Sequence, residues 1–100
     1  ILPHKRFIRE DYDIYLEFPL KFSTAVLGGS LEVPTLNGKT NLKIPSGTQS
    51  HTIFRLKGQG IKKLNSYGHG DQYVRVIIEV PKDIDKKQKE LLKEFEKTLN

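Results

Sequence analysis

Hydrophobic and polar residues alternate along several short stretches of the chain, which is the pattern of strands with one buried face. Residues 13–20 form the first stretch, with every second residue apolar. Pro19 cannot donate a ladder hydrogen bond, so we expect the pairing of this strand to end there. The most regular alternation runs over residues 71–80 and stops before Pro81. Shorter runs at 31–33, 42–44 and 52–56 predict further strands.

Glycine residues between these stretches predict where the chain turns. After the first strand, Ser23 can cap a single helical turn, and Gly28 with Gly29 can supply the positive φ that ends it. Asn37-Gly38 is a pair that readily adopts a type I′ turn, so we expect a hairpin around it. Residues 57–70 combine several glycines with few apolar side chains and predict a long loop.

The end of the chain changes to a helical pattern. Asp85 and Gln88 stand three residues apart, as in a capping box that opens a helix. A helical spacing of apolar residues follows, at Leu91, Leu92, Phe95 and Leu99. The pattern as a whole predicts a mainly β fold: a small β-sandwich-like domain with a short helix after the first strand and a C-terminal amphipathic α-helix over 85–99.

Composition narrows the class of protein. A length of 100 residues with 36% apolar side chains suits one domain with a modest core. The chain begins at Ile1 and contains no methionine, so we expect a fragment or a processed chain. It also lacks cysteine, which removes disulfides and thiolate metal sites. No apolar stretch approaches the roughly 20 residues that span a bilayer, so we expect a cytoplasmic protein without a membrane partner.

Candidate catalytic and cofactor motifs have simpler interpretations. Gly58-Gln59-Gly60 resembles the start of a phosphate loop, but Lys63 stands at the third glycine position and no helix is predicted to follow. His69 and Asp71 are two residues apart in a glycine-rich loop, which is weak support for a metal site. We therefore expect no enzyme activity, no cofactor and no metal.

Six segments that carry turns and strand ends occur in a fixed order. They are His4-x-x-Phe7-x-Arg9 with Asp13-Ile14, Ala25-Val26-Leu27-Gly28-Gly29, Val33-Pro34-Thr35-Leu36-Asn37-Gly38, Ile44-Pro45-x-Gly47-Thr48-Gln49, Phe54-Arg55-Leu56-x-Gly58-x-Gly60 and Gly68-x-Gly70-Asp71. In this order they resemble the second C-terminal β-domain of DnaJ-type (heat-shock) co-chaperones, over about residues 3–99. Departures from the family pattern are small, such as Asn37 where Asp is usual.

The resemblance implies a chaperone module. Residues 1–12 would lead in from a preceding β-domain, and residues 13–100 would form C-terminal domain II with its final helix. Such a module binds unfolded or non-native polypeptide, and the parent co-chaperone delivers it to a DnaK-type ATPase chaperone. The family's J-domain tripeptide His-Pro-Asp and its zinc-binding cysteines do not occur in this sequence. This chain alone is therefore expected neither to stimulate ATP hydrolysis nor to bind zinc.

Three residues are candidates for contact with client polypeptide. The resemblance points to Phe7, because in the family the corresponding phenylalanine lies near a shallow apolar groove of the preceding β-domain, which receives peptide as an added strand. Analogy between the two family β-domains extends the suggestion to Leu16 and Phe18 on the first strand. Their alternation also fits an ordinary core, and the core interpretation is the stronger of the two.

Two further interpretations remain open. The family uses its C-terminal helix in a homodimer, so Phe95 and Leu99 either extend a dimer contact or pack on the sheet, and the sequence does not decide between these. The net charge of +5 also suggests an alternative function, that of a small basic β-domain that binds single-stranded nucleic acid. Tyr73-x-Arg75 is the only strand pair of that type, and the basic residues are scattered, so nucleic acid is not an expected partner.

Overall fold

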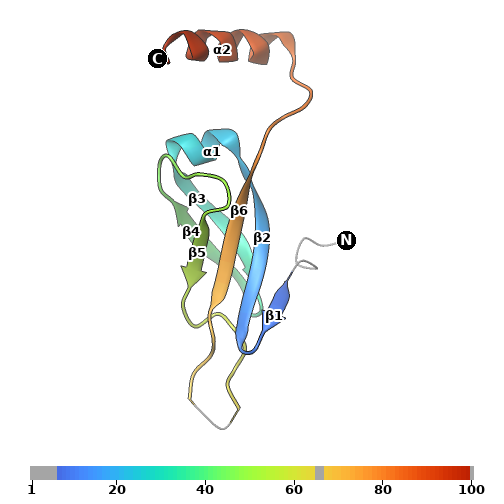
Figure 1. Cartoon of the computed structure of the whole chain (residues 1–100), viewed down its shortest axis with the longest axis vertical. Coiled ribbons are helices and arrows are strands. Elements are labelled where there is room, and N and C mark those ends of the chain that lie inside the picture. Colours follow the sequence, from blue (N-terminus) through green and yellow to red (C-terminus); the bar gives the residue numbers. More distant parts are fainter. Residues whose placement is uncertain (1–6, 65–66, 100) are drawn as a thin grey trace.

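The chain folds into two β-sheets with a short helix at one end and a second helix set apart, as the computed structural model shows for residues 7–64 and 67–99 (Figure 1). A four-stranded sheet has the order β1-β2-β6-β5, and β3 pairs with β4 in a two-stranded sheet. This confirms the predicted mainly β class. The elements are β1 (Ile8–Glu10), β2 (Asp13–Lys21), α1 (Phe22–Leu27), β3 (Gly29–Thr35), β4 (Gly38–Ile44), β5 (Ile53–Leu56), β6 (Gln72–Glu79) and α2 (Lys86–Lys97).

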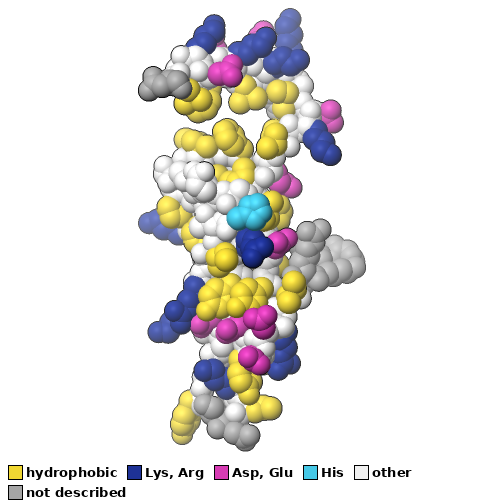
Figure 2. Space-filling model, in the orientation of Figure 1, with side chains coloured by type: hydrophobic (Ala, Val, Ile, Leu, Met, Phe, Trp, Pro, Cys, Tyr) yellow, Lys and Arg dark blue, Asp and Glu magenta, His cyan; other side chains and the backbone are white. Residues whose placement is uncertain are grey.

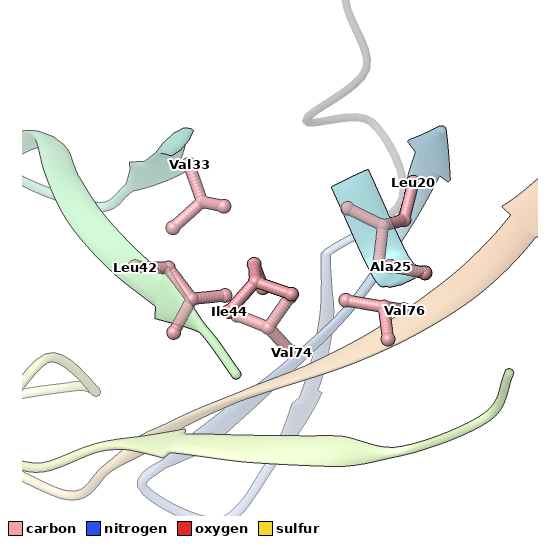
Figure 3. Close-up of a cluster of buried hydrophobic side chains, with 7 residues drawn as sticks. All are labelled: Leu20, Ala25, Val33, Leu42, Ile44, Val74 and Val76. Atoms are coloured by element: carbon pink, nitrogen blue, oxygen red, sulfur yellow. The ribbon is translucent and has the colours of Figure 1, made fainter. Parts of the chain in front are cut away.

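The hydrophobic core lies between the two sheets and is closed at one end by α1 (Figure 3). Strands β2 to β6 each place alternate residues in this core, as the alternation of apolar residues predicts, and α1 adds Ala25. Each fully buried aliphatic side chain contributes about 1.5–3 kcal/mol to stability. The cluster consists of Leu20, Ala25, Val33, Leu42, Ile44, Val74 and Val76, with Phe18, Leu31, Phe54, Leu56 and Ile78 packed around it.

The central pairing of the larger sheet is parallel and joins β2 to β6, two strands that are far apart in the sequence. Its ladder continues through Pro19, which lies opposite Ile77, so the prediction that Pro19 ends the pairing is wrong. The N–H of Ile14 donates to the carbonyl of Asp71. The backbone N–H and C=O groups of the even-numbered β2 residues therefore point toward β6. Pro19 is odd-numbered, so its missing N–H faces the other side and costs this ladder no bond.

Two local predictions need correction. Ser23 does not cap α1, because β2 continues to Lys21 and the helix begins directly at Phe22 without a side-chain cap. The hairpin of β3 and β4 forms, but Thr35 pairs with Gly38, so the turn lies one residue earlier than predicted. Of the expected type I′ pair, only Gly38 has a positive φ, of 126°.

Helix α2 begins with the predicted capping box. The N–H of Gln88 donates to Asp85 Oδ1 at 2.8 Å, and the N–H of Asp85 donates to Gln88 Oε1 at 2.9 Å. The helix stands beyond the end of the domain that carries α1 (Figure 1), and none of its described residues is buried. Neither α1 nor α2 is long and apolar enough to cross a membrane.

Candidate functional site

On one side of strand β2, the described residues pair along only a third of its length. Strand β1 pairs only with Asp13, Ile14 and Tyr15 on that side. Among the described residues, no strand continues this pairing beyond Tyr15. We call the outward backbone groups of Glu17, Pro19 and Lys21, of which Pro19 offers only its carbonyl, the open edge. An open edge offers hydrogen bonds to any extended peptide, because the backbone groups are the same for every sequence.

The three predicted client-binding residues lie near this open edge. Phe7 directly precedes β1, where the register that pairs Ile8 with Tyr15 would set it opposite Leu16. Phe18 lies two residues after Leu16, so its side chain is on the same inward face of β2. Phe7 and Phe18 are half-buried, whereas Leu16 is only 1% exposed. Burial therefore favours the core interpretation for Leu16, and the client contact of all three residues stays a prediction.

The outer face of the larger sheet, turned away from β3 and β4, carries a surface that the sequence analysis missed. The rings of Tyr15 and Tyr73 stack with centroids 5.1 Å apart and planes 15° from parallel. They form the middle of a shallow hollow of about 350 Å³, which we call the tyrosine hollow. Its lining consists of Ile8, Glu10, Tyr15, Leu16, Glu17, Ile53, Tyr73 and Arg75.

Carboxylates give the tyrosine hollow a local negative charge. Arg75 Nη1 lies 3.4 Å from Glu17 Oε2, so these two charges compensate each other. The Glu10 carboxylate forms no hydrogen bond or ion pair with any described residue. Desolvation raises the pKa of the Tyr15 hydroxyl, and the charges of Glu10 and Asp13 raise it further.

These charges bear on the nucleic-acid alternative. Tyr73-x-Arg75, the strand pair that suggested it, lies in the tyrosine hollow. The only cation in that lining is Arg75, and it already faces Glu17. Phosphate groups would meet uncompensated carboxylate charge there, so the arrangement disfavours a nucleic-acid backbone.

Asp71 ties the long loop to the sheet. Its Oδ1 accepts from the N–H of Gly58 at 2.9 Å, and its Oδ2 accepts from Arg55 Nε at 2.8 Å. The hydrogen bond from Gly58 and the charge of Arg55 hold the pKa of the Asp71 carboxyl below its usual range. Its own N–H donates to Asp13 Oδ1 at 2.8 Å. No cluster of three or more potential metal ligands occurs among the described residues.

A second exposed apolar surface lies on α2. Phe95 on the helix is 42% exposed, and Leu99 is 58% exposed and lies two residues beyond the helix end at Lys97, so the helix is shorter than the predicted 85–99. Both side chains line one apolar surface, which we call the apolar stripe. The structure therefore does not place them on the sheet, which was one of the two open interpretations. Figure 2 shows apolar side chains of α2 turned toward apolar side chains at the adjoining end of the domain. Exposed apolar residues of α1 at that end are Phe22, Val26 and Leu27.

The fold and these surfaces define a β-rich domain with an open strand edge and an exposed amphipathic helix. The family described as DnaJ C terminal domain matches residues 1–81. The chain therefore belongs to the DnaJ C-terminal domain family, as its turn motifs suggested.

Bacterial relatives named Chaperone protein DnaJ match most or all of the chain. One from Fusobacterium nucleatum subsp. nucleatum is 51% identical over 100 residues, which is 100% of this chain and 26% of the relative. Relatives from Geobacillus sp. (strain WCH70) and Clostridioides difficile (strain 630) are 53% and 51% identical over 94 residues, which cover 94% of this chain and 25% and 24% of the relatives. The chain thus spans about a quarter of the length of the relatives it matches.

Proposed function

We propose that this chain is the part of a cytoplasmic DnaJ-type co-chaperone that holds non-native polypeptide, which the parent protein passes to a DnaK-type ATPase chaperone. Membership of the DnaJ C-terminal domain family and the names of the relatives support the proposal. Residues 1–12 lead in from a preceding β-domain, and residues 13–100 form the second C-terminal domain. The described part of the lead-in already contributes β1 to the sheet.

The open edge of β2 carries the proposal for how a client binds. An extended client segment pairs with the N–H and C=O groups of Glu17 and Lys21 and with the carbonyl of Pro19, which requires no particular client sequence. Phe7 and Phe18, at the inward side of this edge, contact the apolar side chains of the segment. Backbone pairing supplies general affinity, and these side chains select the apolar segments that folded proteins keep inside.

The first prediction is that Phe7→Ala weakens client binding without unfolding the domain. Loss of one apolar contact should lower affinity for an unfolded polypeptide about tenfold. Suppression of the aggregation of a chemically denatured protein measures the loss, and thermal melting measures the fold. Phe18→Ala should also reduce suppression, but it lowers the melting temperature as well because Phe18 packs against the core.

Leu36→Ala is the matched control for this experiment. Leu36 is 47% exposed at the β3–β4 turn, so its truncation removes apolar surface away from the open edge. It should leave suppression unchanged. If folded Phe7→Ala and Phe18→Ala variants suppress aggregation normally, these residues are not part of the client site. If the unaltered chain does not suppress aggregation, the proposed function is wrong.

We also propose that α2 joins two copies of the chain in a homodimer. An amphipathic helix with no buried residue leaves its apolar stripe in water, which is unfavourable unless a partner covers it. Phe95 and Leu99 lie in that stripe. Burying each in a dimer would contribute about 1.5–3 kcal/mol to association.

The second prediction is that Leu99→Asp weakens self-association at least about tenfold, because a buried carboxylate replaces an apolar contact. Sedimentation equilibrium over a range of chain concentrations measures the dimer constant. Lys97→Asp is the control, since Lys97 lies outside the apolar surface that Leu92, Phe95 and Leu99 line. A dimer equally stable in the Leu99→Asp variant would exclude the helix end from the interface.

A further inference from the structure

The tyrosine hollow combines three kinds of surface in neighbouring cross-strand rows. Ile8 pairs with Tyr15, and Tyr15 pairs with Tyr73, so one row is apolar and aromatic across β1, β2 and β6. The row ends on β5 at Arg55, whose charge Asp71 compensates at 2.8 Å. Glu10 pairs with Asp13 in the row on one side of it. Figure 2 shows this arrangement as an apolar patch in the middle of the face with acidic side chains directly beneath it.

The third row holds a balanced charge pair and more apolar surface. Glu17 pairs with Arg75, and Arg75 pairs with Ile53, which is 50% exposed. Because Arg75 and Glu17 compensate each other, the acidic row of Glu10 and Asp13 sets the sign of the local charge. The hollow is thus locally negative on a chain whose net charge is +5.

We propose that the tyrosine hollow is a second contact for client polypeptide and selects segments in which a Lys or Arg residue lies next to an apolar one. This rests on the proposed function and adds a preference among clients. The cation would lie over a tyrosine ring and near the Glu10 carboxylate. The neighbouring apolar side chain would pack against Ile8 or Ile53.

A pair of labelled, unstructured peptides tests the preference. The two peptides share their apolar residues and differ only in carrying Lys or Glu beside them. Fluorescence anisotropy with the whole chain should show tighter binding of the Lys peptide. Long-range attraction to a chain of net charge +5 would favour the Glu peptide instead, so a Lys preference reports the local charge of the hollow.

Charge-removing variants locate the preference. The double variant Glu10→Gln/Glu17→Gln removes the Glu10 charge and leaves Arg75 without its anionic partner. It should weaken binding of the Lys peptide by about 2- to 5-fold for each change, and leave binding of the Glu peptide no weaker. The control is Glu32→Gln/Glu90→Gln, which makes the same change in net charge on β3 and α2. It should keep the Lys preference intact.

The outcomes separate this inference from the proposed function. Equal binding of both peptides by the unaltered chain, or equal losses in the two double variants, would overturn the selectivity of the hollow. If the selectivity test fails but aggregation suppression still depends on Phe7, the proposed function remains supported. Absence of any binding to peptides or denatured protein would instead refute the proposed function itself.

Discussion

Gly70→Ala is expected to destabilise the domain by about 3 kcal/mol or more, through overpacking against backbone that cannot move aside. A Cβ at this position would overlap the carbonyl group of Tyr12. That carbonyl already accepts from the N–H of Ile61 at 2.8 Å, and the N–H of Gly70 donates to Ile61 O at 3.0 Å. Denaturant unfolding at neutral pH measures the change in unfolding free energy.

Gly68→Ala is the control for this prediction. Gly68 has a φ of 85°, and no atom lies within 4 Å of the Cβ that alanine would add. Its cost should therefore be only the backbone strain of a left-handed residue, about 1–2 kcal/mol. Equal losses for the two variants would contradict the prediction, because the overlap of a Cβ at position 70 with Tyr12 would then cost no more than the left-handed strain at Gly68.

Leu16→Ala should cost about 2–5 kcal/mol of stability, because it empties a space inside the domain. Leu16 is 1% exposed, although it was also a candidate for client contact. Leu27→Ala makes the same chemical change on α1 at a side chain that is 77% exposed, and should change stability by less than about 0.5 kcal/mol. Urea unfolding of the two variants gives the comparison.

The alternative interpretation of Leu16 predicts a different pattern. A groove residue would tolerate truncation and lose client binding, so the melting temperature would stay near that of the unaltered chain while aggregation suppression fell. A Leu16→Ala variant that is as stable as Leu27→Ala and binds clients poorly would return Leu16 to the client site.

Local sequence determined most of the elements, because each depends on residues close together in the chain. Alternation of apolar and polar residues predicts β2 and β6, and the Asp85–Gln88 capping box predicts where α2 begins. Phe7 came from the resemblance of its motif, since periodicity alone carries no signal for a binding residue. Ser23 and the Asn37-Gly38 turn were misplaced by one residue or more, because strand pairing decided where α1 and the hairpin begin.

Long-range pairing decided the rest. No local pattern indicates that β2 and β6 pair in parallel, yet that pairing brings Tyr15 beside Tyr73 and creates the tyrosine hollow. Gly68 and Gly70 look equivalent in the sequence, but Gly68 has a positive φ and Gly70 lies against Tyr12, from a distant part of the chain. Side-chain periodicity is a property of neighbouring residues, whereas strand partners and close backbone approaches exist only after the chain has folded.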